Sequence, residues 1–562
     1  MFVVEIKEIG GANMENAEKA IGFENIQIIS SYGLSELMEL RLISKPNHHT
    51  CVHFSGIIPE TQKDSCVTNA TTNDKIEIYQ VEGDKRVQTL FKGVVTQLSV
   101  KTVRGVYFLT VEALSNTYLL DIKVKSRSFQ NQQLTYVNLF KAILADYSNA
   151  AVIDRATNGA KLNTWALQFL ESDWVFMKRL ASHFGAVLIP DHTSDNPRFW
   201  VGVPEGRERE IENFHFAIGK RLADFRTGSQ NFKPKVSEID YVSYRVESNQ
   251  VLNVGDQVKF QGVGLVIAEV SAAFQQGILK FEYALALKEA IRQDYQVNRQ
   301  LAGVSLPGKV IDRQKDRLRL HLQIDPQQSI EAYWFPFATP YTAEGNSGWY
   351  WMPELNDIVQ LYFRDHYEKN AIVVNSQRQN GATNSKTAVP AVKYLGTPHG
   401  KELQMDDGQI RFTAKESSSG GMFIKLDAED GVEIHSDQLI NVTSDSDIIW
   451  DTKTISIKSA EGVYLVCQQS SVIIDGGVDF KAEKVRVVGL VPPADNLDNS
   501  DSKPEQEEAT NNRKEAGQRE TQPDSEVKAS ELGPNETSPD DAVVDEDEIK
   551  ADVLGAIPVR VG

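Results

Sequence analysis

The stretch from Gly303 to Lys309 is the part of the chain closest to a nucleotide-binding motif. It reads Gly-Val-Ser-Leu-Pro-Gly-Lys, which matches the first part of a phosphate-binding loop. Such a loop continues with a Ser or Thr that holds magnesium, and it opens a helix whose N–H groups face the phosphates. Here Val310 replaces the hydroxyl residue, Pro307 lacks an N–H, and a strand pattern follows. These departures argue against a nucleotide site.

A second group of residues has side chains that can bind metals. His48, His49, Cys51, His53 and Cys66 lie close together in the sequence. Structural zinc sites usually show tighter paired spacing, and Cys51 and His53 on one face of a strand supply only two ligands at once. We therefore interpret these residues as ordinary loop and strand positions, and we predict no metal site.

Hydrolytic motifs are absent from the sequence. Neither His-Glu-x-x-His nor Gly-x-Ser-x-Gly occurs, and Gly345 to Gly348 lacks the spacing of a nucleophile elbow. The neighbouring carboxylates Asp406 and Asp407 sit in a polar turn, where solvated side chains are expected. We predict that the chain is not an enzyme, that it has no catalytic, cofactor-binding or metal-binding residues, and that it needs no cofactor.

The composition limits the classes of partner. The net charge is −19, and residues 491–550 alone hold 18 acidic and 6 basic residues. Nucleic-acid binding needs concentrated Lys and Arg, so we expect no nucleic-acid partner. No apolar run approaches the ~18 residues of a membrane span. Three cysteines without a Cys-x-x-Cys pair fit a reducing compartment.

The N-terminus, from Met1 to Glu8, lacks the basic region and apolar core of a signal peptide. We therefore expect the chain to be made and assembled in the cytoplasm. A length of 562 residues allows three or four domains, and 41% hydrophobic residues are enough for sizeable cores.

The most regular pattern of the chain lies between Met422 and Leu490. Pairs of apolar residues two positions apart recur about every eight residues, and Gly, Asp, Ser and Asn separate the pairs. The pairs are Ile424/Leu426, Val432/Ile434, Ile440/Val442, Ile448/Trp450, Ile455/Ile457, Val463/Leu465, Val472/Ile474, Val478/Phe480 and Val485/Val487. This rhythm is typical of a β-helix or prism with one short strand per repeat.

The number of strands favours an oligomer. About eight strands wound around three faces by one chain give fewer than three turns, roughly 13 Å of stack at ~4.8 Å per strand. Repeat stacks need about three turns to hold. Three intertwined chains instead give a rod of roughly 40 Å. The pattern therefore predicts a homotrimeric needle.

Upstream of this region the chain is predicted to be mainly β with small α/β insertions. Strand patterns at 37–43, 75–81, 88–100 and 106–114 indicate a barrel, since a closed meander hides its edges. Helices are expected at 137–147 and after Ser172, which can cap a helix that ends near Gly185. Short strands follow at 186–190 and 198–203. Strand patterns at 238–246, 257–260, 265–270 and 279–287 indicate a second barrel.

A third, smaller barrel is predicted between Val304 and Ser376. Five runs with period two, at 308–312, 317–324, 332–338, 357–363 and 371–375, fit a small five-stranded barrel. Its aromatic residues Trp334, Trp349, Tyr350 and Trp351 can stack on bases, but packing between this barrel and neighbouring domains is the preferred interpretation.

The predicted organisation has seven parts. They are a first β-barrel (1–125), an α/β segment (126–205), a second β-barrel (206–300), the five-stranded barrel (301–376), a connector (377–421), the trimeric β-helix needle (422–490) and an acidic disordered tail (491–562). The tail has no aromatic residue and too little apolar surface to fold alone. It ends in a hydrophobic run, Val553 to Val561, that can dock onto a partner. The connector is too short for a catalytic domain.

Several runs of residues resemble the VgrG spike family of type VI secretion and other contractile injection systems, from about residue 25 to 490 and in the family's order. The runs that resemble the family's hub are Thr89 to Val95, Leu119 to Asp121, Ser128 to Gln130 and Phe169 to Phe176. They imply that residues 1–300 form a hub of two β-barrels with an α/β hub segment between them. The runs that are similar to the family's oligonucleotide/oligosaccharide-binding (OB) type barrel are Leu306 to Val310, Arg317 to Leu320, Gly348 to Glu354 and Asn356 to Val359. The run Tyr333 to Phe337 departs from the family, which often has a fuller basic stretch there. Phage-tail hubs and extracellular contractile particles share the architecture.

The resemblance implies a structural role as the homotrimeric spike and baseplate hub of a contractile injection apparatus. It implies contacts with an Hcp-like tail-tube protein, baseplate proteins, a separate PAAR-like tip protein or effector, and the target membrane during puncture. Gly489 to Val491 is the expected docking point of the tip. The spike would be assembled in the bacterial cytoplasm and exported by contraction into a target cell or the extracellular space.

Two alternatives of other classes stay open. One is a cell-wall or glycan enzyme, which any turnover by the purified protein would support. The other is a cargo or effector adaptor of an extracellular contractile particle or a phage-tail-like bacteriocin, with the acidic tail recruiting the cargo.

Overall fold

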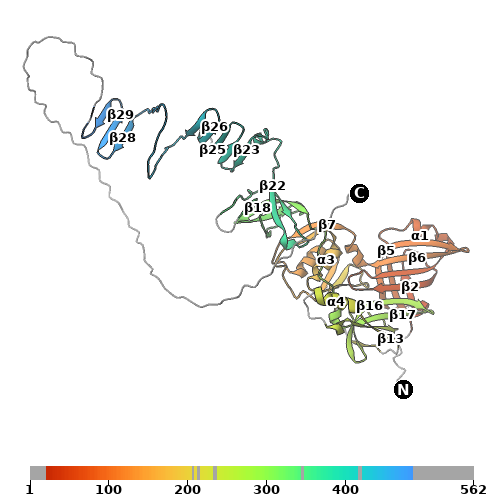
Figure 1. The fold of residues 1–562 in the computed structure, drawn as a ribbon. Helices are drawn as coiled ribbons and strands as arrows, with labels where there is room; N and C mark the ends of the chain where they lie inside the picture. Colours follow the sequence, from red (N-terminus) through yellow and green to blue (C-terminus); the bar gives the residue numbers. More distant parts are fainter. Residues whose placement is uncertain are drawn as a thin grey trace, which may run out of the picture. The chain divides into compact units, whose positions relative to one another are not determined.

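A computed structural model describes residues 20–205, 208–211, 215–231, 237–342, 347–415, 421–484 and 486. The chain divides into two compact units, Met1–Ile440 and Asn441–Gly562. The predicted disordered tail, the tip-docking point at Gly489 to Val491 and the pair Val485/Val487 lie outside the described residues or at their margin. Figure 1 shows that the described part is mainly β.

The largest element is a 12-stranded sheet. Its main path runs through β1 (Ile26–Ile29), β4 (Lys75–Glu82), β5 (Lys85–Val103), β6 (Val106–Ser115), β3 (Cys51–Ile58), β2 (Glu36–Ser44), β16 (Val263–Gln275), β17 (Ile278–Ala286), β14 (Val242–Ser248) and β13 (Phe216–Lys220). β15 (Gln257–Phe260) pairs with β16, and β12 (Arg209–Glu210) pairs with β15. These strands belong to the two predicted hub barrels.

The two predicted hub barrels are joined into this one sheet. Strand β2 pairs with β3 on one side and with β16 on the other, through Arg41–Ser44 and Val270–Ala273. Among the described residues, β1 and β13 are the ends of the path, and no strand pairing closes either half. The sequence patterns predicted the strands but not their order in the sheet. Alternation of apolar and polar residues indicates which face of a strand a residue lies on, but it does not indicate which strand lies beside it.

Alternation along the strands creates a shared core. β3 alternates half-buried and buried positions, with Val52, Phe54 and Ile58 inside. Inward-facing residues of β16 and β17, among them Ile267 and Tyr283, belong to the same apolar cluster. The two halves of the sheet are therefore held by one core as well as by the β2–β16 pairing.

An α/β segment packs a second core. It contains α2 (Tyr136–Leu144), α3 (Asp173–Ser182), the pair β7 (Val124–Phe129) and β9 (Ala166–Ser172), and the sheet of β10 (Leu188–Pro190), β11 (Arg198–Val201) and β8 (Ala151–Asp154). Both predicted helices are present. The Ser172 hydroxyl accepts from the N–H of Val175, as an N-cap does. Gly185, with φ +64°, lies three residues past α3, where a left-handed residue favours glycine.

The OB-type barrel has the five strands that the sequence predicts. Their order is β20 (Trp334–Pro336), β19 (Arg317–Leu322), β18 (Ser305–Gln314), β21 (Ile358–Tyr362) and β22 (Ile372–Gln377). A bridge between Phe337 and Val373 brings the two ends of this sheet together. Its core includes Leu320, Phe335 and Val359, each fully buried.

Two small antiparallel sheets follow. The first has the order β23 (Lys393–Gly396), β24 (Glu402–Met405), β25 (Gln409–Lys415), β26 (Met422–Asp427) and β27 (Gly431–His435). The second has the order β28 (Val463–Cys467), β29 (Ser470–Ile474) and β30 (Val478–Lys481).

The remaining helical elements are short. They are α1 (Ser65–Thr68), α4 (Leu222–Asn231) and the 3-10 turns Phe23–Asn25, Glu60–Gln62, Asn116–Leu120, Glu238–Tyr241, Lys288–Ala290, Glu368–Asn370 and Ser385–Thr387. The predicted strand at 238–246 thus begins with a turn, in which Asp240 accepts from the N–H of Ser237. No helix within the described ranges has the length and apolarity needed to cross a membrane.

Candidate assembly surfaces

The five-stranded sheet β23–β27 has one apolar face, which we call the needle face. The strand register places its side chains in two rows across the sheet. One row is Leu395, Leu403, Phe412, Ile424 and Ile434, and the other is Met405, Ile410, Leu426 and Val432. Residues of one row face the same side because successive side chains of a strand alternate.

The needle face is uncovered in the single chain. Val432 is 69% exposed, Ile434 60% and Phe412 48%. The opposite face is polar, with Arg411, Lys425 and Glu433 in neighbouring positions. Lys425 forms ion pairs with Asp427 and Glu433, at 3.5 and 3.6 Å. A sheet with one charged face and one bare apolar face is typical of a surface that binds another protein.

The segment 436–462 continues the apolar rhythm without forming a strand in the single chain. The three predicted pairs Ile440/Val442, Ile448/Trp450 and Ile455/Ile457 are each more than half exposed, between 52% and 68%. Extended backbone with neither a core nor strand partners leaves its N–H and C=O groups to water. These residues therefore lack the partners that the predicted needle would supply.

The sheet β28–β30 repeats the arrangement on a smaller scale. Its register places Val463, Ile474 and Val478 in one row, with Leu465 and Val472 in the next row of the same face. Leu465 is 57% exposed and Val478 55%. This sheet also presents an uncovered apolar face.

The strands of the single chain differ from the sequence prediction, since β23–β25 lie within the predicted connector (377–421) and predicted repeats pair with each other. The pairs Ile424/Leu426 and Val432/Ile434 were expected on separate repeats, but they lie opposite each other in a hairpin between β26 and β27. The turn from Ala428 to Asp430 allows this pairing, since Asp427 accepts from the N–H groups of Glu429 and Asp430. A chain considered alone can pair only with its own neighbouring strands.

A buried ionic network joins the α/β segment to the OB-type barrel. Arg179 of α3 is 2% exposed, and its guanidinium donates to Glu171 at 2.8 Å and to Glu368 of the barrel at 2.6 Å. Trp165 lies in the barrel core, and its indole N–H donates to the Glu368 carbonyl at 3.2 Å. The barrel is therefore anchored by both charge and apolar packing.

A second polar contact lies at the same junction. The carboxylate of Asp325 accepts from the backbone N–H of Ser128 at 2.6 Å and also from its hydroxyl. Burial raises the pKa of Asp325, although the bonds to Ser128 oppose the shift. The Gln130 side chain donates to the Leu320 carbonyl and accepts from the N–H of Tyr333, so strand β7 is held against the barrel.

The motif Gly303–Lys309 leads into strand β18 and is no phosphate cradle. Leu306 and Pro307 pair with Leu361 and Gln360 of β21, and Lys309 pairs with His321 of β19. The backbone of this stretch is thus used in the barrel ladder. The expected absence of a nucleotide site stays a prediction.

The metal-capable residues are not brought together. His48 bonds to the Pro46 carbonyl, Cys51 and His53 lie in β3, and Cys66 lies in α1. Within the described ranges no group of His, Cys, Asp and Glu side chains has the arrangement of a metal site. Asp406 accepts from the N–H groups of Gly408 and Gln409, which is the polar-turn role that the sequence suggested.

One polar constellation was not found from the sequence. His49 contacts the Thr117 hydroxyl through Nδ1 at 2.9 Å and Asp121 through Nε2 at 3.3 Å. The bond from His49 helps to lower the pKa of Asp121 despite its burial. Thr117 is fully buried, so this hydroxyl cannot meet a substrate. These residues are far apart in the sequence, and no local motif marks them.

The aromatic residues of the barrel are divided between two environments. The Arg319 guanidinium lies 4.5 Å from the ring centre of Trp334, which is half-buried. In contrast, Trp349, Tyr350 and Trp351 are 54%, 72% and 47% exposed. The predicted packing against neighbouring domains is therefore not present for these three residues in the single chain.

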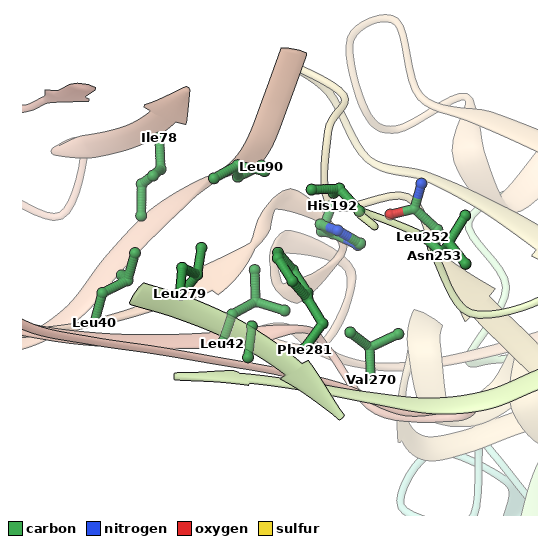
Figure 2. A pocket seen from close by; sticks show the side chains of 12 residues that line it. Leu40, Leu42, Ile78, Leu90, His192, Leu252, Asn253, Val270, Leu279 and Phe281 are labelled. Carbon is green, nitrogen blue, oxygen red and sulfur yellow. The ribbon is translucent and has the colours of Figure 1, made fainter. Parts of the chain in front are cut away.

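The hub core contains an apolar pocket beneath the joint between the two halves of the sheet. Figure 2 shows its walls, with Leu40 and Leu42 from β2, Phe281 from β17 and His192 from a loop. The space open to a water molecule is about 20 Å³, roughly what one water needs. The pocket is too small for an organic ligand, and burial lowers the pKa of His192 to about 4.

Comparison with known proteins gave similarities at the level of fold. No family model matches the sequence, and no curated protein matches it. Among solved structures, the chain is similar to the E. coli c3393 protein, a component of the type VI secretion system described as structurally similar to the T4 bacteriophage tail proteins gp27 and gp5. The two sequences are 14% identical, the match covers 63% of this chain and 99% of the other chain, and the TM-score is 0.45.

Two further similarities are of the same order. A chain of the lidded Francisella PdpA–VgrG complex matches with 8% identity over 73% of this chain and 79% of the other, with a TM-score of 0.46. The 43 kDa tail protein of prophage MuSo2 from Shewanella oneidensis matches with 11% identity over 49% of this chain and 99% of the other, with a TM-score of 0.36. At these values the function of this chain has to be inferred from its own residues.

Proposed function

We propose that this protein is the structural central spike of a contractile injection apparatus and that it acts as a homotrimer. The observation that carries the proposal is the bare needle face of β23–β27, in which β26 and β27 hold the first two pairs of the eight-residue rhythm. Three copies would turn these faces toward a common axis, where each fully enclosed side chain contributes ~1.5–3 kcal/mol.

The segment 436–462 supports the same arrangement. Its exposed pairs, such as Ile440/Val442 and Ile448/Trp450, would become strands when backbone groups of two other copies lie beside them. Every backbone group in such a rod is paired, so the rod has no free strand edge along its length. A closed rod of this kind suits the transmission of force along an axis.

The junction between the α/β segment and the OB-type barrel suits a mechanical role. A force on the needle passes through the barrel to the hub, and Arg179, Glu171 and Glu368 would resist separation of the two, since breaking a buried pair exposes uncompensated charge. No turnover is needed for this role, and the absence of enzymatic activity stays a prediction.

The proposed partners are those that the VgrG resemblance implies. An Hcp-like tube and baseplate proteins would contact the hub, and a PAAR-like tip or an effector would bind beyond the needle before puncture of the target membrane. Assembly in the bacterial cytoplasm and export by contraction belong to the same proposal. The adaptor alternative depends on residues 491–562, outside the described ranges, and stays a prediction.

A pair of substitutions on neighbouring strands tests the needle face. Ile424→Lys places a charge on that face, whereas Thr413→Lys places the same charge on the opposite face of the sheet. Three buried like charges near one axis would prevent assembly, because unpaired buried charge is strongly unfavourable. We expect Ile424→Lys to be monomeric and inactive in a contraction-dependent export assay, and Thr413→Lys to match the unmodified protein. Equal behaviour of the two variants would contradict the proposal.

A further inference from the structure

The hub sheet has an open groove at one end. Strand β1 pairs only with β4 among the described strands, so its outer edge has no partner there. The first half of β2, from Glu36 to Leu40, pairs with β3 on one side, while β16 reaches only Arg41–Ser44 on the other. A groove of about 660 Å³ lies along these two strands.

The lining of this groove is largely apolar. Phe23, Ile26, Ile28, Leu34, Leu37 and Met38 contribute to it. Met38 is 47% exposed, and Ile26 and Ile28 are only partly buried although they pack against the hub core. Two free strand edges beside apolar side chains form a site that an added strand fits, as in recognition by β-augmentation.

The other end of the same sheet offers such a strand. β13 pairs only with β14 among the described strands, and all five of its residues are exposed. Phe216 is 43% exposed and Ile218 is 62% exposed. The two residues lie on the same side of the strand, two positions apart.

We infer that β13 of one copy docks along the groove at β1 and β2 of the next copy, so that three hub sheets close into a ring. This inference rests on the proposed homotrimer and specifies the contacts between its hubs. A threefold ring needs a heterologous contact, in which two different surfaces of the same chain meet. The groove and the edge strand are two such surfaces. One edge of β13 is occupied by β14, and its free edge pairs with one of the two free edges of the groove.

Charge complementarity supports this pairing. The groove includes the exposed carboxylates of Glu24 and Glu36, and within the described ranges neither forms an ion pair. Strand β13 ends at Lys220, which is followed by Arg221. Lys220 already contacts Glu238 at 2.5 Å, so docking would place it between carboxylates of two copies. Opposite charges at the two surfaces favour the head-to-tail orientation over contact between identical surfaces.

Chemical cross-linking of the full chain tests the contact. Met38→Cys in the groove and Ile218→Cys on β13 are combined in one variant, and each is also made alone. Cys467 is exposed and is replaced by serine, whereas burial raises the pKa of the Cys51 and Cys66 thiols and slows their reaction. The purified protein is treated with a short bismaleimide and run on a denaturing gel, and its mass in solution is measured before treatment.

The double variant is expected to give covalent dimers and trimers, and each single variant is expected to stay monomeric on the gel. A protein that is trimeric in solution but gives no covalent species in the double variant would overturn the inference and leave the spike proposal standing. Covalent dimers from a single variant would also overturn it, since they show contact between identical surfaces. A monomer in solution would instead contradict the proposed function.

Discussion

Arg179 shows how single residues connect the parts of this molecule. Its guanidinium is buried between Glu171, eight positions earlier on β9, and Glu368, which lies in the barrel. Truncation of a buried ion pair leaves the remaining charges without solvent or partner, so its removal is far more harmful than the loss of a surface pair.

We predict that Arg179→Ala lowers the free energy of unfolding by ~3–5 kcal/mol. The matched control is Arg245→Ala, which removes the surface pair with Glu282 and is expected to change stability by no more than ~1 kcal/mol. Urea unfolding followed by tryptophan fluorescence measures both, with Trp165 and Trp174 as buried reporters. Similar losses in the two variants would show that the junction does not depend on the buried network.

Two histidines, the buried His192 and the half-buried His183, make the hub sensitive to acid. Burial lowers the pKa of His183 and of His192 to about 4, against an ordinary value of 6.5. His183 is held by the Tyr136 hydroxyl and stacks on Tyr295, and His192 faces the pocket of Figure 2. Both side chains are therefore neutral in the folded state at neutral pH.

The sign of the pH effect follows from these values. Between pH 6.5 and 4 the unfolded chain binds protons at His183 and His192 while the folded chain does not, so stability falls as the pH falls, by ~3 kcal/mol for each histidine. We predict that substitution of His192 by Gln reduces the loss between pH 7 and pH 4.5, measured by urea unfolding at the two values. The unmodified protein, unfolded in the same buffers, is the control. An unchanged slope for His192→Gln would contradict the assignment.

At the scale of elements, helix caps and the alternation of apolar residues predicted individual helices and strands, because these depend on residues close together in the sequence. Ser172 and Gly185 bound helix α3 as expected, and the strand predicted at 257–260 is β15. The five runs of the OB-type barrel became its five strands. Turn chemistry and period-two alternation carry this information within each segment.

Contacts between distant segments could not be predicted. The joining of β2 to β16 and the bonds of Arg179 and His49 depend on residues that are more than 50 positions apart or that carry no motif of their own. The exposed state of Trp349 to Trp351 was also missed, since an aromatic run looks the same in a core and on a surface. The sequence therefore indicates which faces are apolar and leaves open what covers them.

The strands missing from 436–462 give a prediction at this scale. We expect the backbone amides near Ile440, Ile448 and Ile455 to be protected from hydrogen exchange in the assembled protein and to exchange freely in the monomeric variant Ile424→Lys. Protection would arise from pairing between copies, because the single chain supplies no strand partner there. Amides of the hub strand β6 serve as the internal control and should be protected in both proteins.

At the scale of the whole molecule, the hub, the barrel and the two C-terminal sheets differ in how complete they are alone. The hub and barrel have buried cores, with residues such as Phe91 and Phe335 fully buried. The sheets β23–β27 and β28–β30 have apolar faces but nothing to cover them. The covered cores of the hub and barrel and the uncovered faces of the two C-terminal sheets fit a protein whose N-terminal part folds first and whose needle forms on assembly.

The central claim is that three copies share one interior, and the mass of the purified full-length protein in solution tests it most directly. Light scattering coupled to size exclusion should give three times the 62.7 kDa of the chain, with no change on dilution to micromolar concentration. A stable, well-folded monomer whose Ile440 and Ile448 are protected by their own chain would contradict the account.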